Sequence, residues 1–213
     1  MKKILVVFIS ILILMPEVKS STTSASSYIL MDQNTGRVLL SKDKDSQRLI
    51  ASITKIMTCI LALESGKSED VVIVDDNATS AYGSGIYIEV GEEIKLKDLL
   101  YGLMLRSGND AASMIAAYVS GSVEEFVKLM NNKAKELGMK NTIFYTPSGL
   151  PTPHGNTSTV YDMAILTKYA MQNKEYREIV STKKYKTATN KKTYIWHNKN
   201  DLSLYIGVEI EFE

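Results

Sequence analysis

The order of the predicted elements indicates an α+β fold in one domain with two lobes. Strand patterns come first, a run of helical patterns fills the middle of the chain, and a further strand pattern follows the helices. No internal repeat or low-complexity linker interrupts residues 26–213, so they are interpreted as a single domain.

The strand patterns open with a hairpin. Residues 27–32 and 37–41 form two short apolar runs, joined by a turn that contains Asn34-Thr35-Gly36. Short strands are also predicted at 71–74 and, after the last helix, at 193–197.

Helical patterns occupy most of the rest of the domain. Apolar residues recur at helical spacing in five segments, 52–65, 95–106, 110–119, 123–138 and 159–172. Ser122 precedes the fourth segment and Glu125 follows three positions later, which is the capping box that begins many helices.

The first 25 residues have the layout of a secretory signal peptide. Lys2 and Lys3 precede an apolar run at 4–15, and small polar residues follow it. The run is short for a membrane span, and cleavage is expected after Ser20 or after Ala25. We therefore expect an extracytoplasmic protein, secreted or associated with the cell envelope, with no transmembrane span in the mature chain.

The most informative motif is Ser52-Ile53-Thr54-Lys55. Residues three apart on a helix lie on one face, so the Lys55 amine can reach the Ser52 hydroxyl. A serine hydroxyl is a weak nucleophile until a base removes its proton, and a lysine is such a base only when its pKa is lowered. The structural alternative is that Ser52 is a helix N-cap and Lys55 a surface lysine.

Two further SxxK matches are less informative. Ser41 with Lys44 and Ser181 with Lys184 both lie in charged runs, where solvated turns are the simpler interpretation.

A second motif, Ser107-Gly108-Asn109, is the only SxN sequence in the chain. It lies between the predicted helices 95–106 and 110–119. A short polar break between two apolar helices can hold a hydroxyl and an amide at the bottom of a cleft. Helix capping is again the simpler alternative.

From about residue 28 to residue 207, the chain resembles the low-molecular-mass penicillin-binding proteins, specifically the secreted serine-type D-alanyl-D-alanine carboxypeptidases of bacterial cell-wall maturation. Beyond the two motifs, the resemblance rests on stretches in a consistent order, namely Tyr28-Ile29-Leu30-Met31-Asp32, Asn34-Thr35-Gly36, Gly91-Glu92-Glu93, 135–142 and 147–151. It implies a fold of the penicillin-binding protein or β-lactamase type, with a catalytic cleft between an antiparallel sheet and a helical lobe.

The resemblance also implies roles for the motif residues. Ser52 would form an acyl-enzyme with the penultimate D-alanine of a peptidoglycan stem pentapeptide, and Lys55 would be its general base. Ser107 would relay a proton to the leaving amine, and Asn109 would hold the lysine and the substrate amide. The implied partners are the peptidoglycan peptide and β-lactam antibiotics, which act as acylating inhibitors.

Enzymes of this type normally add a Lys-Thr-Gly or Lys-Ser-Gly strand, and neither sequence occurs in the 213 residues. Residues 198–208 resemble the approach to that strand, and 209–213 stand where it would be expected. We therefore expect a chain truncated before this motif, with incomplete C-terminal strands. The resemblance implies that this strand supplies one of the two N–H donors of the oxyanion hole. Loss of one such donor costs about a hundred- to a thousandfold in turnover, so impaired activity is expected.

Two other functions stay open. A catalytically silent peptidoglycan-binding or penicillin-sensing domain would fit the missing Lys-Thr-Gly strand. A β-lactamase has a similar fold, but its class A form has SDN where this chain has SGN, and no ExxLN-like element is present.

The remaining reactive side chains suggest no cofactor. His154 and His197 stand alone, without the spacing of a metal site, and no metal or organic cofactor is implied. Cys59 is the one cysteine and is interpreted as a core residue. The net charge of +1, with mixed signs, gives no reason to expect nucleic acid as a partner.

Overall fold

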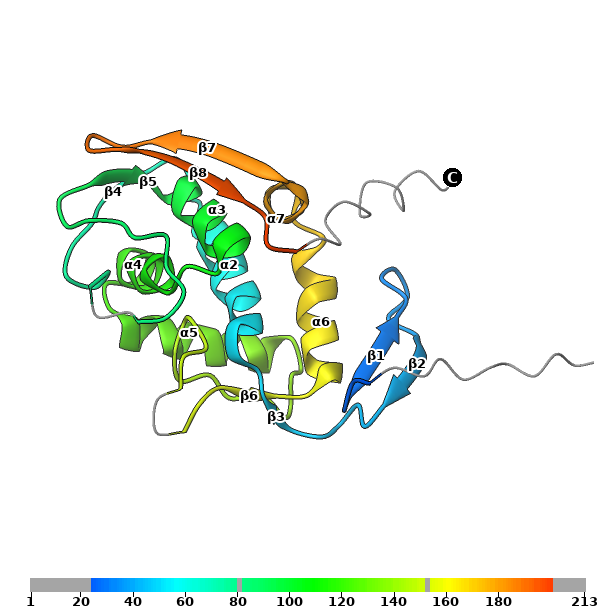
Figure 1. Cartoon of the computed structure of the whole chain (residues 1–213). Coiled ribbons are helices and arrows are strands. Elements are labelled where there is room, and N and C mark those ends of the chain that lie inside the picture. Colours follow the sequence, from blue (N-terminus) through cyan, green and yellow to red (C-terminus); the bar gives the residue numbers. More distant parts are fainter. Residues whose placement is uncertain (1–23, 80–81, 152–153, 201–213) are drawn as a thin grey trace, which may run out of the picture.

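The computed structural model of the chain describes residues 24–79, 82–151 and 154–200 (Figure 1). Strands and helices follow one another in the order β1 (Tyr28–Met31), β2 (Val38–Lys42), β3 (Arg48–Leu49), the 3₁₀ helix η1 (Ala51–Thr54), α2 (Lys55–Glu64), β4 (Val71–Ile73), β5 (Glu93–Lys95), α3 (Leu96–Arg106), α4 (Asn109–Ser120), α5 (Val123–Glu136), β6 (Thr157–Ser158), α6 (Val160–Ala170), α7 (Lys174–Ser181), β7 (Lys184–Ala188) and β8 (Thr193–His197).

Most of the predicted signal peptide lies outside this part of the chain. Residues 1–23 are not among the described residues, and neither are residues 201–213. Within the described ranges, no helix has the length and apolar character that a membrane crossing requires.

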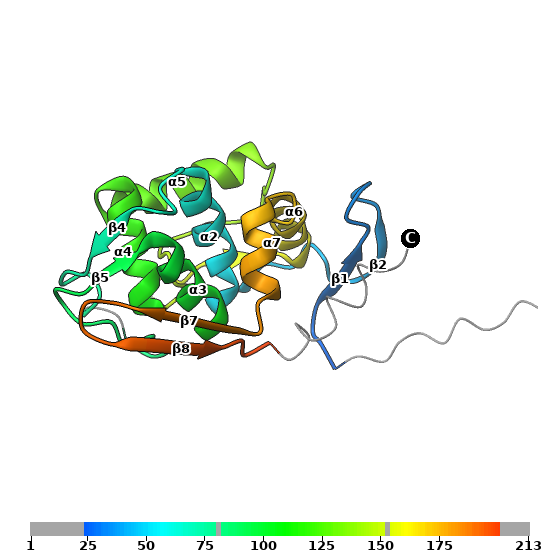
Figure 2. The ribbon, with the colours of Figure 1, turned by 90° about the horizontal axis from the view of Figure 1, so that it is seen from above.

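The core is built around α2, which lies among the other helices (Figures 1 and 2). Met57, Cys59 and Ile60 on this helix are at most 1% exposed, and almost all of its other residues are buried as well. A helix that is apolar on nearly every side is stable only when neighbours cover it all round, and α3, α4, α5, α6 and α7 do so. Since α2 begins at Lys55, this packing also fixes the position of that lysine.

Helices α3 and α4 are joined by the turn at Ser107 and Gly108. Ser107 ends α3 in the left-handed conformation, with φ 59° and ψ 40°, and reverses the chain direction. Ala111, Ala112 and Ala116 on α4 are fully buried, and their small side chains let α4 approach its neighbours closely.

The strands form four antiparallel pairs within the described residues, β1 with β2, β3 with β6, β4 with β5 and β7 with β8. The hairpin predicted at 27–32 and 37–41 is confirmed as β1 and β2, of which β1 lies beside α6. The β7–β8 hairpin crosses α3 and buries Tyr194 and Trp196 (Figure 2). Antiparallel strands around a helical lobe confirm the predicted α+β fold class.

The five predicted helices are confirmed to within a few residues. One half of the predicted capping box of α5 is present, because the Ser122 hydroxyl accepts the Glu125 N–H at 3.1 Å. The helix predicted at 52–65 begins later than expected, because residues 51–54 form a 3₁₀ turn and α2 begins only at Lys55.

Several short elements were not predicted. Helix α7 buries only Tyr176 and Ile179, and two apolar positions do not make a periodic pattern. Strands β3, β5 and β6 are two or three residues long, which is too short for a visible alternation. The turn interpretation of the two weaker SxxK matches is confirmed only in part: residues 43–46 form a turn, whereas Ser41 lies in β2 and Ser181 ends α7.

Candidate active site

Ser52 and Lys55 meet where η1 joins α2. The Lys55 amine Nζ lies 3.1 Å from the Ser52 hydroxyl Oγ, as expected for residues one helical turn apart. Ser52 is exposed, whereas Lys55 is only 2% exposed. Both structural alternatives are therefore wrong: Lys55 is not a surface lysine, and the N-cap of α2 is Thr54, not Ser52.

Two further oxygen atoms hold the Lys55 amine beside Ser52. Nζ donates to Oδ1 of Asn109 at 2.8 Å and to the main-chain oxygen of Ser148 at 2.8 Å. A neutral amine has two N–H bonds and one lone pair. When these two oxygens take the N–H bonds, the lone pair is left for the Ser52 hydroxyl.

Burial lowers the pKa of Lys55 to about 8. The charged form loses hydration in this environment, which is the largest contribution. The negative charge of Asp110 raises the pKa in part, and the positive charge of Lys199 lowers it further. A substantial fraction of the amine is thus neutral near physiological pH, as a general base requires.

The SGN turn brings the other two predicted residues to the same place. The Ser107 hydroxyl donates to Ser52 Oγ at 3.0 Å. Asn109 is buried and is the first residue of α4, and its Nδ2 donates to the main-chain oxygen of Tyr82 at 2.6 Å. This bond orients the amide so that Oδ1 faces Lys55. The capping alternative is confirmed in one respect, because Ser107 is the C-cap residue of α3. The Ser107 hydroxyl, however, contacts Ser52.

Residues 146–151 and 154–156 form a wall of the site that the sequence pattern did not predict. Besides the Ser148 oxygen at Lys55, the main-chain oxygen of Pro147 accepts the Thr58 hydroxyl at 2.6 Å. The buried Asn156 amide donates to Thr54 Oγ1 at 2.9 Å and thereby ties this segment to η1. The sequence of residues 147–151 resembles the family but does not predict their contact with Lys55. A main-chain oxygen carries no sequence signal, because any residue supplies one.

Glycine is required at position 149 in this wall. Its φ of +82° lies in the left-handed region, and a Cβ there would lie 1.8 Å from the main-chain oxygen of Ala51. Ala51 itself has a positive φ of 42°, immediately before Ser52. Left-handed backbone at Ala51 and at Ser107 flanks Ser52, and such conformations often cluster at functional sites.

The other reactive residues lie elsewhere. His154 packs against the Tyr145 ring and His197 ends β8, and no metal-binding group of three or more His, Cys, Asp or Glu residues occurs in the described ranges. Cys59 is fully buried in α2, as predicted for a core residue, and burial raises the pKa of its thiol. The Ser181 hydroxyl donates to helix carbonyls of α7, including that of Arg177 at 2.8 Å.

The arrangement combines an exposed hydroxyl, a buried amine of lowered pKa, a second hydroxyl at hydrogen-bonding distance and an oriented amide. These are the groups that covalent acyl transfer through a serine requires. The structure brings together all four residues that the two motifs singled out.

Comparison with known proteins points in the same direction. Residues 15–211 match the peptidase S11 family, described as D-alanyl-D-alanine carboxypeptidase. The chain is 41% identical over 192 residues to D-alanyl-D-alanine carboxypeptidase DacF of Bacillus subtilis, a match that covers 87% of this chain and 49% of the relative. The chain thus spans about half the length of this curated relative.

Solved structures give the same result for the fold. A D-alanyl-D-alanine carboxypeptidase from Mycobacterium tuberculosis superposes with a TM-score of 0.81 at 29% identity, covering 84% of this chain and 68% of that one. Penicillin binding protein 5 from Haemophilus influenzae gives a TM-score of 0.79 at 32% identity, covering 89% and 56%. With a family match over most of its length and two motifs that converge on one site, the chain belongs to the peptidase S11 family of D-alanyl-D-alanine carboxypeptidases.

Proposed function

We propose that this protein is a serine acyl-transfer hydrolase that removes the terminal D-alanine from peptidoglycan stem peptides. The observation that carries the proposal is the Lys55 amine, which two oxygen acceptors turn toward Ser52. The names of the relatives, D-alanyl-D-alanine carboxypeptidases, supply the substrate.

The reaction begins at Ser52. Lys55 takes the hydroxyl proton as Ser52 Oγ attacks the carbonyl carbon of the penultimate D-alanine. The tetrahedral intermediate collapses, the peptide C–N bond breaks, and the leaving amine receives the proton from Lys55 through the Ser107 hydroxyl. Asn109 keeps the amine oriented throughout. Water then attacks the ester on Ser52, and the shortened peptide leaves with a free carboxylate.

β-Lactams fit the same chemistry. A serine that attacks a peptide carbonyl attacks the strained lactam carbonyl, the ring opens, and the ester on Ser52 persists because the ring nitrogen stays attached. We propose β-lactams as acylating inhibitors of Ser52 and the peptidoglycan peptide as its substrate. Because that substrate lies outside the cytoplasmic membrane, we propose an extracytoplasmic location.

Release of free D-alanine from a peptide ending in D-Ala-D-Ala tests the proposal. We expect the folded chain to release it at a reduced rate, because the sequence contains no Lys-Thr-Gly or Lys-Ser-Gly, Ser52→Ala to abolish the release, and the control Ser41→Ala to leave it unchanged. Ser41 is also part of an SxxK match but lies in β2, away from the motif residues. Release that survives in Ser52→Ala, or is absent from the folded wild-type chain, would contradict the proposal.

A further inference from the structure

Asp110 is a buried carboxylate to which the mechanism above gives no role. It lies in the first turn of α4, next to Asn109, and is 6% exposed. Among the described residues, no cation lies within ion-pair distance of it. A carboxylate taken out of water in this way needs other donors.

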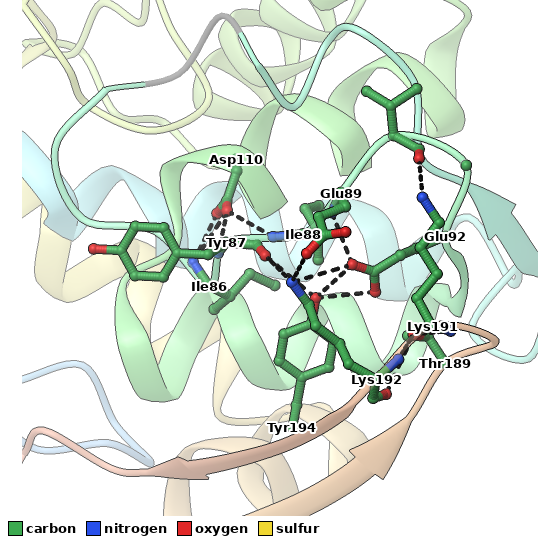
Figure 3. A network of polar contacts seen from close by, with 12 residues as sticks. Ile86, Tyr87, Ile88, Glu89, Glu92, Asp110, Thr189, Lys191, Lys192 and Tyr194 are labelled. Atoms are coloured by element: carbon green, nitrogen blue, oxygen red, sulfur yellow. Dashed lines mark hydrogen bonds and ion pairs between the residues drawn. The ribbon is translucent and has the colours of Figure 1, made fainter.

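Main-chain N–H groups of one loop supply most of those donors (Figure 3), and the N–H of Ala111 on α4 donates as well, at 2.8 Å. The Asp110 carboxylate accepts the N–H of Ile86 at 3.0 Å, of Tyr87 at 2.7 Å and of Ile88 at 3.4 Å. Three successive N–H groups turn toward one carboxylate only if the backbone curls, and Tyr87 accordingly has a φ of 60°. Bulky residues adopt this conformation only when their surroundings hold them in it.

The fit between loop and carboxylate is close. A Cβ built on Gly85 would lie 3.1 Å from Asp110 Oδ2, so a side chain there would require the Asp110 carboxylate or the loop to shift by a few tenths of an ångström. The loop is thus fixed against the start of α4 both by hydrogen bonds and by contact.

The other end of the same loop holds the catalytic amide. The main-chain oxygen of Tyr82 accepts Asn109 Nδ2 at 2.6 Å, and that of Ser84 accepts the Asn109 N–H at 2.8 Å. The first of these bonds decides which way the amide points, and hence whether Oδ1 faces Lys55. Any shift of the loop therefore reaches Lys55 through Asn109.

We propose that Asp110 is a positioning residue for acyl transfer: it holds the loop 82–88 against α4 so that Asn109 presents its Oδ1 to Lys55. This inference rests on the proposed function. Asp110 also acts through space, because burial lowers the pKa of Lys55 and the negative charge of Asp110 partly offsets that effect. Mutations can separate the effect of Asp110 on the position of the loop from the effect of its charge on Lys55.

Asp110→Asn removes the charge and turns an amide N–H₂ toward the loop donors. We expect amide hydrogen exchange at 86–88 to become faster, the pKa of Lys55 to fall, and acylation by fluorescent penicillin to slow about ten- to a hundredfold. The matched control is Asp98→Asn, because Asp98 is also a buried carboxylate but binds the hydroxyls of Tyr185 and Thr187. The control should leave all three quantities unchanged.

Gly85→Ala separates the two effects, because its Cβ crowds the contact between the loop and Asp110 Oδ2 while the carboxylate stays charged. We expect slower acylation and faster exchange at 86–88, with the pKa of Lys55 much closer to wild type than in Asp110→Asn. This variant also decides the inference if Asp110→Asn does not fold.

These measurements distinguish a failure of the proposed function from a failure of the inference about Asp110. A folded wild-type chain that takes no label contradicts the proposed function. A labelled wild type, with Asp110→Asn and Gly85→Ala equal to it in exchange and acylation rate, overturns the role of Asp110 alone. A loss of acylation in Asp98→Asn as large as in Asp110→Asn would assign the effect to general destabilisation and would also overturn it.

Discussion

At Lys55, burial and a nearby charge act in opposite directions on the pKa. Removal from water disfavours the ammonium form, while the negative charge of Asp110 favours it, and Asn109 Oδ1 and the Ser148 oxygen accept N–H bonds from either form. The pKa consequently falls from its ordinary value of 10.5 to about 8, not to a value at which the lysine would be a weak base. A base with a pKa near the working pH combines availability with proton affinity.

The first prediction is the pH profile of acylation. The pKa of Lys55 is about 8, so the rate constant for acylation by penicillin should rise about tenfold per pH unit well below pH 8 and level off above it. Stopped-flow or gel-based labelling between pH 6 and pH 9.5 measures it, with circular dichroism as the check on folding. A flat profile across pH 7–9 would exclude Lys55 as the base.

A second residue-scale prediction concerns Gly149. Gly149→Ala should destabilise the protein by about 3 kcal/mol or more and block labelling, because its Cβ would overlap the Ala51 oxygen. The control is Gly138→Ala, which has a similar φ of +75° but no atom within 4 Å of the new Cβ, and should cost only about 1–2 kcal/mol. Equal losses in chemical denaturation would refute the overlap.

Among the elements, the β7–β8 hairpin depends on one buried carboxylate. Glu92 is fully buried and accepts the Tyr194 hydroxyl at 2.8 Å, while Lys192 Nζ lies 3.4 Å away (Figure 3). Glu92 also accepts the Glu89 N–H at 2.8 Å. These bonds join the start of the β8 strand to the residues just before β5.

Glu92→Gln should therefore destabilise the protein by about 1–3 kcal/mol, because an amide nitrogen cannot accept the hydrogen bonds that a carboxylate oxygen accepts, while Lys192 keeps its ion pair with Glu89. Glu93→Gln is the control, because this neighbouring side chain is exposed, and its effect should stay within about 0.5 kcal/mol. Urea denaturation of both variants measures the difference. Similar small effects in the two would show that the network contributes little.

Whether the sequence predicts a contact in the site depends on how far apart along the chain the two residues lie. The contact between Ser52 and Lys55 follows from local helical spacing, and it was predicted. The bond from Lys55 to Asn109 joins residues 54 positions apart, and only the family resemblance suggested it. The Ser148 oxygen was missed because main-chain atoms leave no trace in a side-chain pattern.

For the whole molecule, the N-terminal pattern and the family set an expectation about location. We predict that the mature protein begins between Ser21 and Ser26 and is exported, because a charged, apolar and then small-residue sequence directs secretion. Mass spectrometry of the exported product determines the first residue. Uncleaved protein found only in the cytoplasm would refute export.

The central claim is that Ser52 is the nucleophile of an acyl-transfer site assembled by Lys55, Ser107 and Asn109. It is tested most directly by prolonged incubation of the folded chain with penicillin, followed by intact-mass measurement and peptide mapping. We predict one penicilloyl group per chain, on the peptide that contains Ser52, and none in Ser52→Ala. An adduct on another serine, such as Ser41 or Ser181, or no adduct in the folded protein, would contradict the account.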